Sequence, residues 1–123
     1  MPRFAWAAMA LTLIALPAGA QTPVKIVFFA DWSGAIDDAA KNVIAQAAEA
    51  AKQSPKAAIT VTGYADSTGS VKANHFLTEL RAQRVIDGLE ADGVPAKRLK
   101  MVAAGRQAEL GVASRRVEIS IAQ

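Results

Sequence analysis

The sequence predicts an α+β domain in which two main helices pack on one face of a mixed four-stranded sheet, in the order β-α-β-α-β-β. Four short segments rich in β-branched residues predict the strands, and two longer segments with apolar residues at helical spacing predict the helices. The chain has 123 residues, of which 52% are hydrophobic and 20% are charged. This size and composition are typical of one globular domain with a single core.

The first half of the pattern is a strand, a helix and a second strand. Residues 24–29 (VKIVFF) are β-branched and aromatic, as is common in strands. A helix is predicted from Ile36 to the residues before Pro55, because the apolar residues there follow the i, i+3, i+4 spacing. Residues 58–64 (AITVTGY) alternate between the two faces, which predicts a half-buried strand.

The second half contains a helix and two further strands. A polar loop over residues 65–70 precedes a longer helix, which ends at a C-cap glycine, Gly93. Residues 99–103 and 117–121 predict the third and fourth strands. Each helix should connect two parallel strands by a right-handed crossover. The short connection over residues 105–114 allows the last two strands to pair as an antiparallel hairpin.

The first twenty residues have the layout of a secretory signal peptide. Arg3 precedes the apolar run Phe4–Leu16, and Pro17–Ala20 supplies a helix break and an A-x-A cleavage pattern. The run has 13 residues, whereas a membrane span needs about 20. The sequence therefore predicts a signal peptide over residues 1–20 and a mature domain over residues 21–123. The alternative is an uncleaved membrane anchor.

The composition excludes several classes of function. The absence of cysteine excludes disulfides, thiolate catalysis and cysteine metal sites, and a single histidine excludes a multi-histidine site. The basic residues are scattered and the formal net charge is only +3, so a nucleic-acid-binding surface is not expected. Gly63 and Gly69 match no phosphate-loop spacing, and His75 should lie at the surface. We expect no enzymatic activity, no cofactor and no metal site.

One face of the second helix is polar where a core-facing helix should be apolar. Asn74, Thr78 and Arg81 lie on a stripe that continues, toward the end of the helix, with Ala82, Val85 and Leu89. A guanidinium on that side cannot remain unpaired, so Arg81 should meet a carboxylate. The nearest candidate is Asp66, in the loop before the helix.

The spacing leaves two interpretations of Asp66 and Arg81 open. They could line a polar cleft for a ligand that carries an ammonium and a carboxylate on one carbon, such as the end of an amino acid. The free N–H groups at the start of the helix would also favour an anion there. Alternatively, the two residues form a permanent salt bridge that binds no ligand.

Residues 74–85 (NHFLTELRAQRV) resemble the central signature of OmpA-like peptidoglycan-binding domains. That signature reads Asn, two residues, Leu-Ser, two residues, Arg-Ala, two residues, Val, and only its serine is replaced here, by Thr78. Residues 63–70 (GYADSTGS) resemble the strand and loop before the signature, and residues 93–95 and 115–118 match two further family marks. The resemblance covers essentially the whole chain after the predicted signal peptide.

The resemblance implies a non-catalytic domain of the bacterial periplasm that holds the diaminopimelate residue of the peptidoglycan stem peptide non-covalently. By that similarity, Asp66 accepts the ligand ammonium and Arg81 binds its carboxylate. The other expected ligand-binding residues are Asn74, Thr78, Leu77, Ser67, Thr68, Asp31 and Arg116. The mature domain should be associated with the cell wall, and any association with the outer membrane would come through partner proteins. The alternative is an OmpA-like protein–protein interaction module of the cell envelope that has lost peptidoglycan binding.

Three departures from the family pattern bear on the site. Ala65 replaces the usual threonine before the aspartate, and Asp31 is displaced by one position. The connection over residues 105–114 is short and lacks the proline of many relatives. Adjacent strand residues face opposite ways, so only one of Arg115 and Arg116 should face the cleft, and Arg116 is preferred.

The expected environments of the aromatic residues and of Arg81 complete the prediction. Phe28, Phe29 and Phe76 are expected in the core, whereas Trp32 follows a strand and could line the cleft. Because the resemblance favours a hydrated cleft, replacing Arg81 by alanine should change the free energy of unfolding by less than ~1 kcal/mol.

Overall fold

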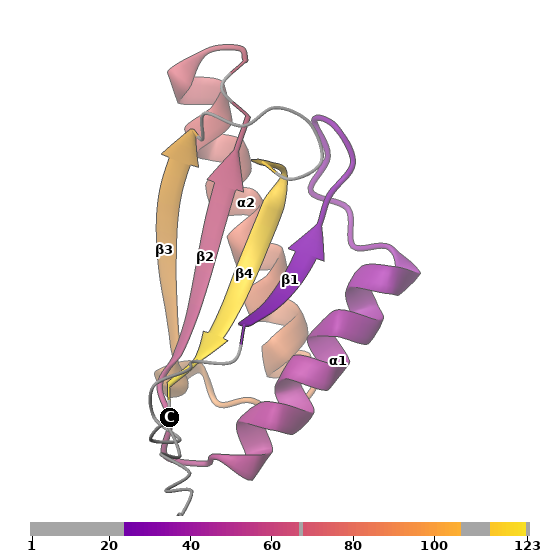
Figure 1. Ribbon diagram of the computed structural model, residues 1–123, viewed down its shortest axis with the longest axis vertical. Coiled ribbons are helices and arrows are strands. Elements are labelled where there is room, and N and C mark those ends of the chain that lie inside the picture. The colour runs from indigo at the N-terminus through magenta and orange to yellow at the C-terminus, as the bar shows by residue number, and fades with distance from the viewer. Residues whose placement is uncertain (1–23, 67, 107–113, 123) are drawn as a thin grey trace, which may run out of the picture.

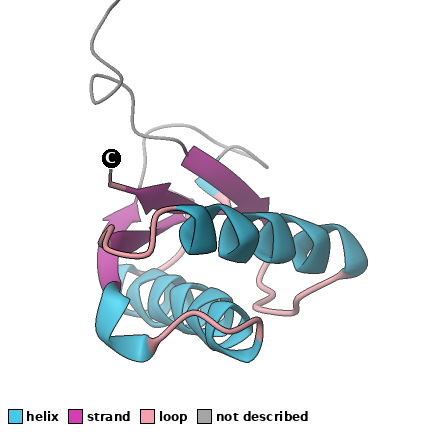
Figure 2. Cartoon of the chain, turned by 90° about the horizontal axis from the view of Figure 1, so that it is seen from below, coloured by secondary structure: helices cyan, strands magenta, loops and turns pink. Residues whose placement is uncertain are grey.

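The computed structural model describes residues 24–66, 68–106 and 114–122, and the predicted signal peptide lies outside these residues. Within them the chain follows the predicted order of strands and helices. Figure 1 shows the strands as one sheet, and Figure 2 shows both long helices on the same face of it. The elements are β1 (Val24–Phe28), α1 (Asp38–Gln53), β2 (Ile59–Ala65), α2 (Val71–Ala91), η2 (Ala96–Arg98), β3 (Leu99–Arg106) and β4 (Arg116–Ile121).

The strand order is β1-β4-β2-β3. β4 runs antiparallel to β1 and to β2, while β2 and β3 are parallel. Both helical crossovers therefore join parallel strands, as predicted. The predicted hairpin between the last two strands is wrong, because β4 lies between β1 and β2 (Figure 1). In that place β4 forms hydrogen bonds with a neighbouring strand on each side, whereas a strand at the sheet edge would have only one neighbour.

The core lies between the sheet and the two helices. β4 turns Val117, Ile119 and Ile121 toward the helices, and β2 turns Ile59 and Val61 the same way. The helices contribute Ala40, Ile44, Ala47, Ala48 and Ala51 from α1, and Ala82, Val85, Ile86 and Leu89 from α2. Burial of each large aliphatic side chain contributes roughly 1.5–3 kcal/mol. The apolar half of α2 is therefore the half that holds it on the sheet.

Polar caps fix where the two helices begin. The carboxylate of Asp37 accepts a hydrogen bond from the Ala40 amide at 2.8 Å, so Asp37 is the N-cap of α1. The Ser70 hydroxyl accepts from the Ala73 amide at 3.0 Å and caps α2. Such caps contribute about 1 kcal/mol each. Gly93 ends α2 with φ +100°, which confirms the predicted C-cap region.

Two of the three phenylalanines expected in the core are exposed. Phe29 is buried as predicted, but Phe28 is 48% exposed and Phe76 is 67% exposed. Phe28 has the opposite strand parity to Val27 and Phe29, so its ring lies on the sheet face that the helices leave open. Phe76 lies on the outer side of α2. In the part of the chain that the structure describes, no helix has the length and apolar character needed to cross a membrane.

Candidate ligand-binding site

β1 and β2 finish at the same end of the sheet at which α2 and β4 begin (Figure 1). Residues from these ends line a pocket. Its lining residues come from the β1–α1 loop, the β2–α2 loop, the first three turns of α2 and the residue before β4. They are Asp31, Trp32, Asp66, Asn74, Leu77, Arg81 and Arg115. The structure thus brings together five of the nine residues that the sequence assigned to a ligand. Two arginines and two aspartates share this pocket.

Arg81 crosses from α2 to the β1–α1 loop and is only 1% exposed. Its Nε donates to the carbonyl of Ser33 at 2.7 Å, and its Nη2 donates to the carbonyl of Ala30 at 3.0 Å. The guanidinium also lies 5.4 Å from the centre of the Phe29 ring. Among the described residues, no carboxylate oxygen lies within 4 Å of its guanidinium nitrogens, and the nearby Asp66 pairs with Arg115 instead. The charge of Arg81 is thus held by backbone carbonyls and an aromatic ring.

Four influences act on the pKa of Arg81. Burial lowers it most, and the positive charge of Arg115 lowers it further. Asp66 and Asp31 act in the opposite direction, through space, and raise it. An arginine stays charged under all ordinary conditions. Because burial and Arg115 outweigh the two aspartates, additional negative charge close to the Arg81 guanidinium would stabilise the pocket.

Asp66 pairs with a different arginine from the one expected. Its Oδ2 lies 3.6 Å from Nη1 of Arg115, and its Oδ1 accepts a hydrogen bond from the Ser114 hydroxyl. Both charged side chains are largely buried. Arg115 also donates from Nε to the carbonyl of Phe29 at 3.4 Å. The proposed direct salt bridge between Asp66 and Arg81 is therefore wrong.

The preference for Arg116 over Arg115 at the pocket is also wrong. The Arg116 guanidinium lies 4.0 Å from the centre of the Tyr64 ring, and its Nε donates to Glu118 at 3.0 Å. These groups share the sheet face away from the helices. The parity of β4 contained the missing signal, because Arg115 lies two residues before the buried Val117 and so shares its face.

Asn74 shapes the β2–α2 loop instead of presenting a free amide. Its Nδ2 donates to the carbonyl of Ser70 at 3.0 Å and to that of Thr68 at 2.5 Å. The Thr68 carbonyl is therefore already engaged by the protein. Ser67 lies outside the described residues. Leu77 is buried and lines the pocket, as the sequence predicted.

Thr78 is fully buried and is not among the pocket-lining residues. It lies where α2 comes closest to β2, since a Cβ built on Gly63 would be 2.7 Å from the Thr78 carbonyl oxygen. Among the described residues its hydroxyl has no hydrogen-bond partner. Thr78 is therefore a packing residue beneath Gly63. A larger residue in place of Gly63 would push α2 away from β2.

Trp32 lies over the pocket in an unusual backbone conformation. The Ser33 amide donates to the Ala30 carbonyl at 3.2 Å, which closes a turn in which Trp32 has φ +51°. A side chain in this left-handed region costs about 1–2 kcal/mol. The indole lies against Gly69, where a Cβ would be only 2.8 Å from its Cη2. Gly69 itself has φ +83°, so both its conformation and its contact with Trp32 require glycine.

The pocket is closed in this structure. The free volume between its side chains is about 10 Å³, which is near the lower limit for one water molecule. The expectation of an open, hydrated cleft is therefore wrong as well. Arg81 is neither in a salt bridge nor in an open cleft, because the loop around Trp32 folds over it and supplies its hydrogen bonds. Asp31 lies in the same turn and remains exposed at the rim.

The remaining candidate groups lie away from the pocket. His75 is exposed on α2, and its Nε2 lies 3.0 Å from Glu79, which confirms the expected surface position. Within the described ranges, no group of three or more His, Cys, Asp or Glu side chains is placed to hold a metal ion.

Sequence comparison relates the chain to known proteins. The sequence profile of the OmpA family matches residues 28–120. The probable lipoprotein YiaD of Escherichia coli K12 is 34% identical over 103 residues, which are 77% of this chain and 47% of that protein. The peptidoglycan-associated lipoprotein of Agrobacterium fabrum is 34% identical over 86 residues, which are 70% and 49% of the two chains. The chain thus spans about half the length of these two relatives.

Structural comparison agrees with the sequence profile. The crystal structure of the peptidoglycan-associated lipoprotein from Burkholderia pseudomallei superposes with a TM-score of 0.71 at 25% identity. The superposition covers 79% of this chain and 89% of that one. The family profile covers most of the chain, from the last residue of β1 through both long helices, β2 and β3 to Ser120 in β4, so this chain belongs to the OmpA family.

Proposed function

We propose that this chain binds peptidoglycan non-covalently, by taking the amino acid end of a diaminopimelate residue of the stem peptide into the pocket. The observation that carries the proposal is the guanidinium of Arg81, which is buried without a directly paired carboxylate. A buried, unneutralised cation favours an anionic ligand strongly. The names of the relatives from A. fabrum and B. pseudomallei, both peptidoglycan-associated lipoproteins, support peptidoglycan as the binding partner.

The charges of the pocket suit a zwitterion. The ligand carboxylate would approach Nη1 of Arg81 and the guanidinium of Arg115. The ligand ammonium would bind beside Asp66, which stays paired with Arg115, and Asp31 at the rim would be a second acceptor. Diaminopimelate carries an ammonium and a carboxylate together at its side-chain end, whereas lysine carries only the ammonium. A stem peptide with lysine would lose the contact to the arginines, and a charge-assisted hydrogen bond is worth about 1.5–3 kcal/mol.

The proposal is one of binding without catalysis. The pocket side chains are two guanidiniums, two carboxylates, an amide, an indole and a leucine, so the lining contains no imidazole to act as a base at neutral pH. The domain would act in the periplasm, after removal of residues 1–20, as a module that attaches to the cell wall. Incubation of sacculi with the protein should accordingly release no soluble fragments.

Co-sedimentation with insoluble peptidoglycan tests the proposal. The full chain should sediment with diaminopimelate-type peptidoglycan and at least about tenfold more weakly with lysine-type peptidoglycan. Equal binding to both types would refute the proposed contacts to the arginines. Failure to sediment with either would refute peptidoglycan binding and favour the alternative of a protein-interaction module.

A further inference from the structure

The pocket cannot admit an amino acid end in its present form. The space that it leaves for a water-sized sphere is about 10 Å³, which is about enough for one water molecule. An ammonium and a carboxylate on one carbon are several times larger than a water molecule. Some part of the lining must therefore move before a ligand of this kind can bind.

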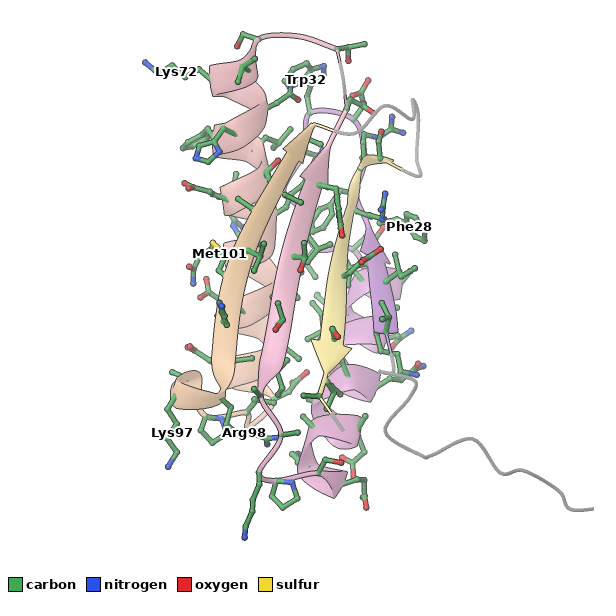
Figure 3. The ribbon with its side chains drawn as sticks, turned by 60° about the vertical axis from the view of Figure 1, so that its left-hand side comes forward. Phe28, Trp32, Lys72, Lys97, Arg98 and Met101 are labelled. Carbon is green, nitrogen blue, oxygen red and sulfur yellow. The ribbon has the colours of Figure 1, made fainter. Side chains whose placement is uncertain are left out.

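Trp32 is a large side chain of the lining that is more than half exposed. Asn74, Leu77 and Arg81 are buried on α2, and Asp66 is held by Arg115. Trp32, by contrast, is 56% exposed and rests on Gly69 at one edge of its ring. Figure 3 shows it at the end of the sheet, among the loops that surround the pocket.

The turn that carries Trp32 is anchored at both ends and strained in the middle. Arg81 binds the carbonyls of Ala30 and Ser33, which flank the turn. Trp32 itself occupies the left-handed conformation that glycine usually supplies. Strained conformations of this kind persist where the surroundings enforce them, and they cluster at ligand clamps and functional loops. Here the anchored turn places the indole in the pocket lining and against Gly69.

We propose that Trp32 is a lid that controls access to this pocket and contacts the bound ligand. In the free protein the indole lies on Gly69 and excludes the ligand. When an amino acid end binds, the indole leaves Gly69 and packs on the methylene chain that follows the charged groups. This inference rests on the proposed function for the identity of the ligand, but the closure by Trp32 is a property of the free chain.

Tryptophan fluorescence offers a direct test, because Trp6 and Trp32 are the only tryptophans of the chain. In the full chain with Trp6→Phe, all tryptophan emission comes from Trp32, whether or not residues 1–20 are removed. Titration with a soluble stem peptide that contains diaminopimelate should shift this emission and change its quenching by iodide. A titration in which the peptide binds by calorimetry but the emission of Trp32 stays constant would overturn the lid.

Binding kinetics give a second test. Trp32→Gly removes the indole and installs the residue that suits φ +51°, so the fold should be kept, as a thermal melt would verify. If the open state is populated at about one tenth, association of the stem peptide should become roughly tenfold faster. Phe28→Ala is the matched control, since it removes an exposed aromatic ring from the other face of the sheet (Figure 3).

The outcomes separate the lid from the proposed function. If the unmodified chain binds and Trp32→Gly associates no faster, the lid is refuted and the proposed function stands. If Trp32→Gly binds and the unmodified chain does not, the pocket is closed by Trp32 and the lid is supported. If neither binds the peptide, both inferences fall.

Discussion

Two arginines at opposite ends of the sheet use the same chemistry for different purposes. Arg98 lies at the end away from the pocket (Figure 3) and donates to the carbonyls of Ala51, Ser54 and Ala57 at 2.6–3.0 Å. Arg81 lies at the pocket end and donates to the carbonyls of two loop residues at 2.7 and 3.0 Å. Each arginine thus ties a loop to an element that is distant in sequence.

The surroundings of the two arginines differ. Arg98 is partly exposed and meets carbonyls at and just beyond the C-terminal end of α1, where the helix carries partial negative charge. Arg81 is buried with a second arginine and two aspartates close enough to affect its pKa. Hydrogen bonds from arginine to carbonyls therefore identify a loop anchor but not a binding site. The buried, mixed-sign cluster around Arg81 is the feature that points to a ligand.

Arg81→Ala should have the largest effect. It leaves the carbonyls of Ala30 and Ser33 without a donor and empties the space beside Phe29, so the free energy of unfolding should fall by about 2–4 kcal/mol. Sedimentation with peptidoglycan should be lost in the folded fraction. Urea unfolding measures the first effect, and Arg84→Ala, an exposed arginine of the same helix, is the control. A loss below about 1 kcal/mol would restore the open-cleft expectation.

Arg98→Ala should reduce stability without reducing binding. One carbonyl in the last turn of α1 and two in the connection after it lose a shared donor at a partly exposed site, so we expect a loss of about 1–3 kcal/mol. Peptidoglycan sedimentation at a temperature well below the melting transition should equal that of the unmodified chain. Weakened sedimentation in this variant would contradict the distinction between the two arginines.

Asp66→Asn should weaken binding more than it weakens the fold. The amide can still accept the Ser114 hydrogen bond but loses its charge attraction to Arg115, so we expect a stability loss of about 1 kcal/mol. The ligand ammonium loses its main acceptor, and affinity should fall at least about tenfold. Calorimetry with the stem peptide measures the affinity, with Asp87→Asn on the exposed side of α2 as the control. Unchanged affinity would exclude Asp66 from the site.

The smallest effect should come from Tyr64, on the open face of the sheet behind the pocket. Burial and the nearby Glu118 raise the pKa of Tyr64 above its ordinary value of 10, and Arg116 offsets this in part. Above pH 10 the unfolded chain releases the phenolic proton first, so stability should fall as pH rises toward the folded-state pKa. Tyr64→Phe should abolish this contribution. Absorbance titration is direct because Tyr64 is the only tyrosine, and an unshifted pKa would contradict the prediction.

Most of the fold was predictable because it depends on local periodicity. Alternation and helical spacing located every strand and both long helices to within a few residues. The position of β4 was not predictable from its connection to β3, because a loop of that length permits a hairpin. The hairpin is excluded only because β4 pairs with β1 and β2 instead. Phe76 was misplaced for a related reason, since an apolar residue on a helix indicates the core only when its neighbours at helical spacing are apolar too.

The candidate site was predictable in its side chains and not in their partners. The polar stripe on α2 identified Asn74 and Arg81, and the preceding loop identified Asp66. The partners of Arg81 are backbone carbonyls some fifty residues away. Every residue carries a carbonyl, so no sequence pattern marks the ones that will be used. The sequence did suggest that Trp32 could line the cleft, and it does, but no pattern marked its left-handed backbone conformation.

The central place of β4 in the sheet has a consequence for the order of folding. Within the described part of the chain, β1 pairs only with β4. Ser114 and Arg115, which hold Asp66, immediately precede β4. During synthesis, the first strand must wait for the last before it can join the sheet, and contacts between such distant segments form slowly. A chain that lacks its final strand therefore has an incomplete sheet and an incomplete pocket. The sheet and the pocket are both completed when β4 pairs with β1 and β2.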